Sequence, residues 1–448
     1  MIDQAVLRRL DVAAPRYTSY PTVPEWSAAF DAADHSRALA RAAASAAEPL
    51  SLYVHLPFCR ELCSYCGCNV VVTRDPTRVD RYLDALEREV TVMVGHLGDR
   101  RRVARLHLGG GTPTFLDEPQ LLRLWQILTQ PFRLELDAEV AIEIDPAVTR
   151  AAQLTLLGEL GFNRISMGVQ DFDPEVQRAV NRIQSFEETA AAVEHARSVG
   201  FTSVNLDLIY GLPRQTERSF SRTISSVLAL KPDRVAVFSF AFVPDVRPNQ
   251  RRLPVAELPG SAAKHALQTI ADIGLRAAGF VAIGIDHYAR TEDELARAVE
   301  SGTLWRDFQG YTTRRANVTV AFGVSAISDL GFAYAQNHRS LGQHQTAVDK
   351  GRLATCRGKW LTDDDQRRRA LITQLLCNGR ADLGPGGTTY FAAELEALRP
   401  LERDGLVSVD GARLALSDVG RRFARNVTTI FDVYLRRSGA SHTFSRTV

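Results

Sequence analysis

Leu50-Ser-Leu-Tyr-Val-His-Leu-Pro-Phe-Cys-Arg-Glu-Leu-Cys-Ser-Tyr-Cys66 is the stretch of sequence that decides the fold. Its first part, residues 50–57, is predicted to form a buried strand, because it is a short and mostly apolar run that ends at a proline. Three cysteines follow with the spacing CxxxCxxC, at Cys59, Cys63 and Cys66. Cysteines clustered in this way directly after a strand favour a metal site over disulfides.

Strands and helices alternate in the chain downstream of this loop. Together with the first one, the strand candidates are residues 50–57, 103–108, 139–145, 164–170, 203–210 and 234–240. The helical patterns lie at residues 80–94, 118–130, 150–160, 187–199 and 216–230. Strands that alternate with helices in this way predict six parallel βα units and an α/β fold class.

Further regions flank these units. An irregular and helical leader contains Pro-Arg-Tyr-Thr-Ser-Tyr-Pro at residues 15–21. A helical pattern at 259–278 and a strand candidate at 281–286 open a region that is predicted to be loop-rich up to about residue 345. Near the end of the chain, helical patterns at 363–377, 395–403 and 419–434 surround a hairpin with Asp410-Gly411 at its turn, which predicts a small winged-helix-like domain. We expect a leader (1–48), an α/β domain with an extension (49–345) and a helical, winged-helix-like domain (346–448).

The charge of the chain is nearly balanced. Its 448 residues include 54 basic and 52 acidic side chains, for a net charge of +2. This balance gives no electrostatic case for a nucleic acid or an anionic membrane as a partner. No apolar run is long enough to span a bilayer, and the N-terminus lacks the pattern of a secretory signal. We therefore expect a cytoplasmic protein whose cysteines are reduced.

The three-cysteine loop has the ligand set of a catalytic iron–sulfur cluster. Three thiolates can hold three irons of a four-iron cluster and leave the fourth iron open to a small molecule, whereas an electron carrier normally has four cysteines. Cys68 is a candidate fourth ligand, although only Gly67 separates it from Cys66. A structural zinc site is the alternative, but zinc usually takes two separated cysteine pairs.

With Tyr65 before its third cysteine, the loop resembles that of the radical S-adenosylmethionine superfamily. The resemblance implies a partial (β/α)₆ barrel, in agreement with the βα units found above. It also implies a [4Fe-4S] cluster on Cys59, Cys63 and Cys66, with the open iron against S-adenosylmethionine. An electron from the cluster then cleaves this cofactor to a 5′-deoxyadenosyl radical.

Additional motifs narrow the resemblance. They are Pro15–Pro21, the Tyr53-Val-His-Leu-Pro-Phe-Cys run, the Cys-Gly-Cys-Asn that ends at Asn69, Gly109-Gly-Gly-Thr-Pro-Thr, Phe162-Asn-Arg-Ile-Ser-Met-Gly-Val-Gln-Asp-Phe, Asp207-Leu-Ile-Tyr-Gly-Leu-Pro, Phe308-Gln-Gly-Tyr-Thr-Thr and Phe444-Ser-Arg. Together they resemble the oxygen-independent coproporphyrinogen III oxidase family. The resemblance implies an oxidoreductase of anaerobic haem biosynthesis, which converts two propionates of coproporphyrinogen III to vinyl groups and gives protoporphyrinogen IX.

The resemblance also implies site residues, although it assigns none of them a catalytic role. Contacts to S-adenosylmethionine are expected for Tyr53, Tyr65, Gly110, Gly111, Thr112, Glu143, Gln170, Arg182, Asp207 and Ala241. Contacts to a second S-adenosylmethionine molecule are expected for Phe308, Gln309 and Ile327.

The residues themselves support part of this assignment. Glu143, Gln170 and Asp207 lie at or near the C-terminal ends of three successive strand candidates, where barrel enzymes build their sites. For each of them, a surface or capping role is the alternative. The glycines of Gly109-Gly-Gly-Thr let the backbone approach a ligand closely, and a tight turn is the alternative. His287 and Tyr288 are either polar site residues or buried structural ones.

One motif departs from the family. The family commonly has Tyr-Ala-His-x-Pro where this chain has Phe240-Ala-Phe-Val-Pro244. Because a hydroxyl and an imidazole are both missing, the departure bears on the substrate pocket and not on the radical chemistry.

The implied partners are a porphyrinogen substrate and an electron donor such as flavodoxin or ferredoxin. We expect a monomer that binds neither nucleic acid nor membrane. Two other functions are possible on the same scaffold: a paralogous radical enzyme that acts on another tetrapyrrole, and a haem chaperone. Such chaperones generally lack both the leader motif at 15–21 and the cysteine equivalent to Cys68, and this chain has both.

Overall fold

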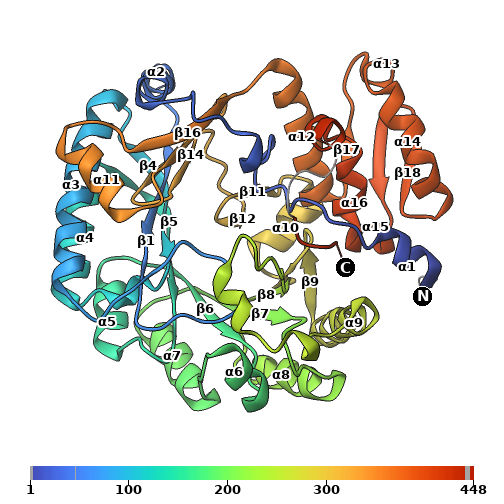
Figure 1. Cartoon of the computed structure of the whole chain (residues 1–448), viewed down its shortest axis with the longest axis horizontal. Helices are drawn as coiled ribbons and strands as arrows, with labels where there is room; N and C mark the ends of the chain where they lie inside the picture. Colours follow the sequence, from blue (N-terminus) through green and yellow to red (C-terminus); the bar gives the residue numbers. More distant parts are fainter. Residues whose placement is uncertain (1–3, 46, 439–443, 448) are drawn as a thin grey trace.

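The computed structural model describes residues 4–45, 47–438 and 444–447 (Figure 1). Small parts of the predicted leader and of the predicted C-terminal domain, at 1–3, 46, 439–443 and 448, therefore lie outside the described residues. Within the described ranges, no helix combines the length and the apolarity needed to cross a membrane.

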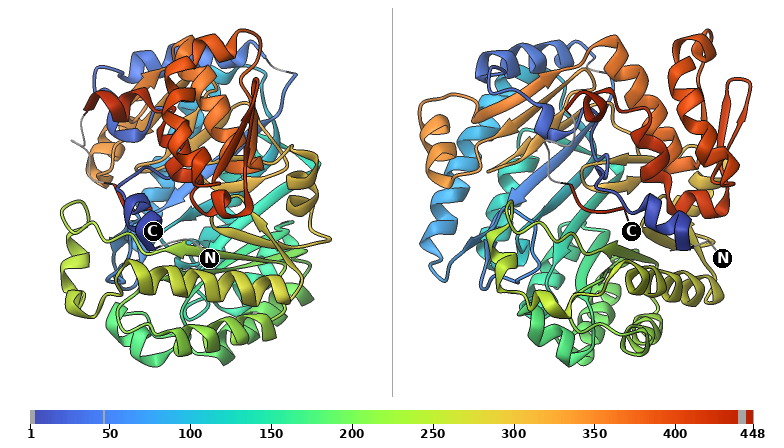
Figure 2. Two further views of the ribbon diagram at one scale, coloured as in Figure 1. Left: turned by 90° about the vertical axis from the view of Figure 1, so that its right-hand side faces the viewer. Right: turned by 45° about the vertical axis from the view of Figure 1, so that its right-hand side comes forward.

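Six adjacent parallel strands form the centre of a 12-stranded sheet. They are β1 (Leu50–Leu56), β4 (Arg102–Gly110), β5 (Arg133–Ile144), β6 (Arg164–Gln170), β7 (Ser203–Tyr210) and β8 (Arg234–Ser239). The helices that connect them cover the outside of the sheet (Figures 1 and 2). These are α3 (Thr77–Leu97), α4 (Glu118–Thr129), α5 (Ala151–Glu159), α6 (Pro174–Val180), α7 (Phe186–Ser198) and α8 (Glu217–Ala229). The predicted partial (β/α)₆ barrel is confirmed.

Polar caps mark where several of these helices begin. Asp117, Ser185 and Thr216 each accept a hydrogen bond from a backbone N–H of the first turn, in capping boxes that start α4, α7 and α8. Such a cap satisfies N–H groups that have no partner inside the helix. The apolar faces that follow pack on the sheet, and a large hydrophobic core runs along the barrel and includes residues from Phe30 to Leu353.

Shorter strands extend the sheet at both edges. Beyond β8 lie β10 (His287–Arg290) and β9 (Phe280–Ile283), both antiparallel. Beyond β1 lie β13 (Thr319–Phe322), which is parallel to β1, and then antiparallel β14 (Ile327–Asp329), β15 (Ala333–Asn337) and β16 (Thr355–Trp360). The prediction of a loop-rich region up to residue 345 is therefore wrong, because most of these strands are too short to show a period in the sequence.

Several smaller elements complete this part of the chain. They are β2 (Phe58–Cys59), β3 (Val71–Val72), α9 (Ser261–Ala277), α10 (Glu294–Ser301), β11 (Trp305–Asp307), β12 (Gly310–Thr312), α11 (Leu341–Asp349) and the 3₁₀ turns η1 (Val23–Glu25), η2 (Pro113–Phe115), η3 (Pro248–Arg252) and η4 (Val255–Glu257). The predicted domain boundary at residue 346 falls inside α11, and β16 pairs with the large sheet.

The last part of the chain has its own hydrophobic core and a three-stranded sheet. Its elements are α12 (Asp363–Asn378), β17 (Arg380–Asp382), α13 (Gly387–Tyr390), α14 (Ala392–Arg403), β18 (Val407–Asp410), β19 (Arg413–Leu416), α15 (Asp418–Arg422), α16 (Ala424–Thr429) and α17 (Val433–Ser438). The hairpin turn predicted from Asp410-Gly411 is present, with Gly411 at φ +57°. The single helix predicted at 419–434 is divided into α15, α16 and the start of α17.

The leader contains α1 (Gln4–Leu10) and α2 (Ala32–Ala43). Its α2 packs on α3 and β16, whereas the segment around residues 13–17 packs against the C-terminal part. The Arg425 guanidinium donates to the carbonyl oxygens of Pro15 at 3.1 Å and of Arg446 at 2.9 Å. Tyr17 is buried, and its hydroxyl donates to Asp432 at 3.0 Å. The two ends of the chain therefore lie side by side (Figure 2).

Candidate active site

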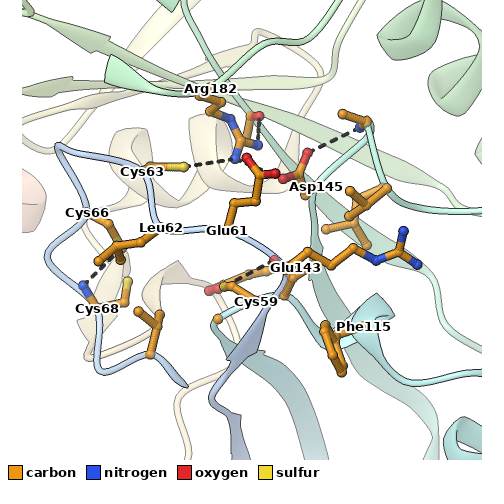
Figure 3. Close-up of a pocket in the computed structure, with 18 of the residues that line it drawn as sticks. Cys59, Glu61, Leu62, Cys63, Cys66, Cys68, Phe115, Glu143, Asp145 and Arg182 are labelled. Atoms are coloured by element: carbon orange, nitrogen blue, oxygen red, sulfur yellow. Dashed lines mark hydrogen bonds and ion pairs between the residues drawn. The ribbon is translucent and has the colours of Figure 1, made fainter. Parts of the chain in front are cut away.

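The three predicted cluster ligands line one cavity of about 860 Å³ at the C-terminal ends of the parallel strands (Figure 3). Cys59 ends β2, and the turn after it is closed by a hydrogen bond from Cys66 N–H to the Cys63 carbonyl at 3.2 Å. Cys68, the alternative fourth ligand, lines the same cavity.

Each of the three sulfurs makes a hydrogen bond with a group from a different part of the structure. Thr112 Oγ1 lies 3.6 Å from Cys59 Sγ, Arg182 Nη1 donates to Cys63 Sγ at 3.8 Å, and the Cys68 N–H donates to Cys66 Sγ at 3.4 Å. Hydrogen bonds to sulfur are among the factors that set the potential of an iron–sulfur cluster.

The thiols differ in acidity. Burial raises the pKa of Cys59 to about 11, and burial also raises the pKa of Cys63, against the lowering effect of Arg182. The hydrogen bond with the Cys68 thiol lowers the pKa of Cys66 to about 6, and the same contact raises that of Cys68. Binding of a metal would release the protons of the thiols that are not already ionised.

The donor set fits an iron–sulfur cluster better than a zinc ion. Among the described residues, no three His, Cys, Asp or Glu side chains converge closely enough to hold one metal ion. A tetrahedral zinc site needs such convergence. In a four-iron cluster each cysteine binds a different iron. The cysteine sulfurs of such a cluster therefore lie farther apart than the ligands of a single zinc ion.

The glycine run that ends β4 closes one side of the cavity. The N–H groups of Gly111 and Thr112 donate to the carbonyls of Leu56 at 2.8 Å and of Phe58 at 2.9 Å. A Cβ atom on Gly111 would lie 2.8 Å from the Pro57 and Phe58 carbonyl oxygens. Gly110 has φ +117°, and a Cβ there would lie 2.7 Å from the His55 ring. Only glycine allows β4 to come this close to the start of the cysteine loop.

Glu143 lies at the end of β5, with its carboxylate at the cavity (Figure 3). His107 Nε2 lies 3.0 Å from Glu143 Oε1, and the Gly110 N–H donates to Oε2 at 3.3 Å. Burial opposes ionisation of this carboxylate, but the contacts from His107 and Gly110 hold its pKa below the usual value. Glu143 therefore carries a negative charge in the cavity at neutral pH.

Asp207, in β7, also lines the cavity but has the opposite shift. Burial raises the pKa of Asp207 to about 6, and the negative charge of Glu143 adds to the effect. Ser166 Oγ donates to Asp207 Oδ2 at 2.9 Å, and Asn205 Nδ2 donates to Oδ1 at 2.8 Å. The site thus holds one firmly ionised carboxylate and one that titrates near neutral pH.

Strain and a partly buried ion pair mark the wall between β5 and α6. Gln170 has φ +66°, a conformation that is unfavourable for a residue with a side chain. Arg182 Nη1 donates to Asp145 Oδ2 at 3.0 Å, and its Nη2 donates to the Gly168 carbonyl at 2.5 Å. This ion pair holds the guanidinium next to Cys63, as Figure 3 shows.

The structure brings together eleven of the sixteen predicted site residues on the cavity wall. These are Cys59, Cys63, Tyr65, Cys66, Gly110, Gly111, Thr112, Glu143, Gln170, Arg182 and Asp207. The other five, Tyr53, Ala241, Phe308, Gln309 and Ile327, are not among the residues that line it. The role of every one of these residues toward a cofactor remains a prediction.

Three of the five residues outside the lining have contacts that show where they lie. Tyr53 is adjacent to it, because its hydroxyl lies 3.1 Å from His55 Nδ1 and its ring packs on His107. Phe308 contacts Trp26 and Tyr334 edge-on. Ile327 pairs with β15 within the sheet.

The Phe240 and Phe242 side chains, which replace polar groups of the family, lie in an apolar cluster with Leu212 and Leu253. Tyr65 packs against the same cluster, and neither phenylalanine is among the residues that line the cavity. The change therefore alters the packing behind the cysteine loop.

Sequence reasoning missed the polar residues that orient the predicted ones. His107 orients Glu143, Ser166 and Asn205 orient Asp207, and Asp145 orients Arg182. Asp145 directly follows the C-terminal end of β5 and so obeys the strand-end rule, whereas His107, Ser166 and Asn205 lie inside β4, β6 and β7 and are not marked by it. Of the two residues left open, Tyr288 is buried and its hydroxyl donates to Asp272, whereas His287 pairs with buried Asp286. Neither is among the residues that line the cavity.

Comparison with known proteins agrees with this geometry. Residues 53–227 match the radical SAM superfamily. The chain is 45% identical over its full length to the oxygen-independent coproporphyrinogen III oxidase of Escherichia coli K12, of which it covers 98%. It is also 45% identical, over 97% of its length and 96% of the relative, to the enzyme of the same name from Pseudomonas aeruginosa.

A solved structure extends the likeness to three dimensions. The structure of coproporphyrinogen III oxidase from Escherichia coli, described as a radical SAM enzyme, superposes with a TM-score of 0.91 at 44% identity. The match covers 97% of this chain and 99% of the other. With the cysteine loop, the glycine run and the strand-end carboxylates in place around one cavity, the chain belongs to the oxygen-independent coproporphyrinogen III oxidase family of the radical SAM superfamily.

Proposed function

We propose that this protein converts the propionates on rings A and B of coproporphyrinogen III to vinyl groups in anaerobic haem biosynthesis. The observation that carries the proposal is the single cavity that joins a three-cysteine loop to two strand-end carboxylates with opposite pKa shifts. The full-length likeness to enzymes of that name supports the choice of substrate.

Cys59, Cys63 and Cys66 would hold three irons of a [4Fe-4S] cluster, and the glycine run and Glu143 line the same cavity. When bound, the cluster and S-adenosylmethionine supply the radical that removes a hydrogen atom from the propionate β-carbon, before carbon dioxide and one further electron leave. The protein's own task is to bind, orient and exclude water.

The two carboxylates would divide the work of binding S-adenosylmethionine. Glu143 is ionised, so it is suited to the positively charged groups of the cofactor. Asp207 titrates near pH 6 and accepts two hydrogen bonds already, so it is suited to a neutral diol. The Gly110–Thr112 backbone would lie along the methionine end.

Arginines at the cavity rim are candidates for the substrate's carboxylates. Arg60, Arg74 and Arg150 line the cavity and are exposed. Coproporphyrinogen III carries four propionates, and arginine binds carboxylates through paired hydrogen bonds. Replacing Arg74 with Met should raise KM for coproporphyrinogen III while uncoupled cofactor cleavage continues.

The electron donor and the cellular setting also belong to the proposal. Cys68 is exposed, and the other loop cysteines are partly exposed. A cluster held there would be within reach of a small redox protein such as flavodoxin or ferredoxin. The nearly balanced charge supports a protein that binds neither nucleic acid nor a membrane. We further propose that it acts as a cytoplasmic monomer.

The test is an anaerobic assay with coproporphyrinogen III, S-adenosylmethionine and a low-potential reductant. The expected products are carbon dioxide, 5′-deoxyadenosine and protoporphyrinogen IX. Cleavage of the cofactor without decarboxylation would reject this substrate and leave another tetrapyrrole. Stable, stoichiometric haem binding without turnover would instead indicate a haem chaperone.

A further inference from the structure

Two consecutive amide side chains hold the backbone of the cysteine loop. Asn249 and Gln250 lie in η3, within the segment between β8 and α9. Asn249 Nδ2 donates to the carbonyl oxygens of Cys63 at 3.2 Å, Ser64 at 3.2 Å and Cys66 at 3.0 Å. Gln250 Nε2 donates to the carbonyl oxygen of Tyr65 at 3.2 Å. One dipeptide therefore binds the carbonyl groups of all four residues from 63 to 66.

The orientation of the Gln250 amide is fixed by its other contacts. Its side chain is 1% exposed. Its Oε1 accepts a hydrogen bond from the Val243 N–H at 2.6 Å, so the NH₂ group must face the loop. The same NH₂ also donates to the Ala241 carbonyl at 3.0 Å. Gln250 thereby ties the cysteine loop to the chain that leaves the end of β8.

The amide pair adds to a small number of other backbone anchors. The Ser64 N–H donates to the Val180 carbonyl at 2.9 Å, and Asn181 Nδ2 donates to the Leu62 carbonyl at 3.1 Å. Both of these anchors come from the end of α6, on one side of the loop. The amide pair approaches from η3, so the loop is held between two separate elements.

We propose that Asn249 and Gln250 are positioning residues for the iron–sulfur cluster, and the proposal rests on the function proposed above only in requiring that cluster. By holding the carbonyl groups of residues 63–66, they fix the backbone from which the Cys63 and Cys66 thiols project. Residues behind the metal ligands commonly set the affinity for the metal, and their loss typically weakens it about 10- to 100-fold.

The sharpest test exchanges a donor for an acceptor without a change of shape. Asn249→Asp places a carboxylate oxygen where the NH₂ group now meets three carbonyl oxygens, so attraction becomes repulsion. Asn249→Ala removes the donors without adding repulsion. The measurement is the rate at which a chelator removes iron from anaerobically reconstituted protein, well below its melting temperature. We expect release to be about tenfold faster or more in Asn249→Asp, with Asn249→Ala between it and the wild type.

The matched control is Asn163→Asp, because Asn163 Nδ2 donates to the Ala138 carbonyl at 2.9 Å in a part of the barrel away from the loop. This variant should lose thermal stability but release iron at the wild-type rate. Equal release from wild type and Asn249→Asp would overturn the inference, and so would equally fast release from Asn163→Asp. A wild-type chain that takes up no cluster would reject this inference and the proposed function together.

Discussion

The central and the edge strands of the same sheet differ in how plainly the sequence encodes them. The central strands, β1 and β4 to β8, are 6 to 12 residues long and alternate with amphipathic helices. The edge strands β13 to β15 are 3 to 5 residues long and almost entirely buried. The predicted site residues follow a similar division, because those in or directly after β4 to β7 share one cavity, whereas Ile327 of the edge strand β14 and Phe308 and Gln309 of the separate β11–β12 hairpin lie outside its lining. Site residues in or after a long strand can therefore be located from the sequence, whereas those in a short strand or hairpin cannot.

The largest effect should come from the cysteine loop. Cys63→Ala should abolish cluster assembly and cleavage of S-adenosylmethionine, because a three-cysteine cluster has no spare ligand. Iron content and 5′-deoxyadenosine formation measure this directly. Cys356→Ala is the control, since Cys356 lies in the edge strand β16 and should keep about four irons per chain. A full iron content in Cys63→Ala would remove the basis for placing the active site on the central strands.

The next largest effect should come from the close approach of β4 to the loop. In Gly111→Ala the new methyl group would lie 2.8 Å from two backbone carbonyl oxygens, so the backbone has to move. We expect a loss of about 1–3 kcal/mol in the free energy of unfolding and a lower iron content. At Gly67, no heavy atom lies within 4 Å of the position that a methyl group would take, and φ is not positive, so Gly67→Ala should be close to neutral. Thermal unfolding of both variants would show whether space at Gly111 is limiting.

The two strand-end carboxylates should be separable by binding. Glu143→Gln removes a negative charge and should weaken S-adenosylmethionine binding about 10- to 100-fold, the range for a charge-assisted hydrogen bond. Asp207→Asn should weaken it less at pH 6, where this carboxyl is partly protonated. Anaerobic equilibrium dialysis at constant iron content measures both affinities. If Glu143→Gln bound S-adenosylmethionine with wild-type affinity, Glu143 would have only a structural role.

The raised pKa of Asp207 also predicts how stability depends on pH. The folded protein holds this proton to about pH 6, whereas an unfolded Asp loses it at about pH 4. Folding is therefore favoured by protonated Asp207, and this stabilisation is lost as the pH rises from about 4 to about 6. The free energy of unfolding of the wild type should fall relative to Asp207→Asn over that window and then run parallel to it. A constant difference between the two proteins would contradict the burial of Asp207.

The distinction between long, periodic strands and short elements also explains what could be predicted from the sequence. The six βα units were predictable because helix and strand periods alternate, and β6 and β7 begin and end where the sequence predicts. Glu143 and Asp207 were predictable because polar residues at or near the C-terminal ends of barrel strands commonly line the active site. Asn249 and Gln250 were not, because an amide side chain that binds backbone carbonyls has no signature in composition or spacing. Their contacts depend on how the segment after β8 folds back over the cysteine loop.

The smallest effect should come from the turn of the β11–β12 hairpin, which lies outside the large sheet. Asp307 Oδ1 accepts hydrogen bonds from the N–H groups of Gln309 at 2.8 Å and Gly310 at 3.1 Å, and Asp307 also pairs with buried Arg105. The backbone of the turn is therefore rigid. Within the described residues, the buried Gln309 Oε1 has no hydrogen-bond partner, and a buried acceptor of this kind calls for a bound donor.

A second S-adenosylmethionine molecule would supply that donor. Gln309→Ala should then leave the first binding event unchanged and weaken only the second, by about 2- to 10-fold, since one neutral hydrogen bond contributes about 0.5–1.5 kcal/mol. Anaerobic dialysis over a wide concentration range separates the two events, with Glu143→Gln as the reference for the first. If both variants weakened the same event, Gln309 would belong to the central cavity after all. If Gln309→Ala changed neither binding event, the β11–β12 hairpin would have no part in cofactor binding. The unpaired Gln309 Oε1 would then need a donor of another kind.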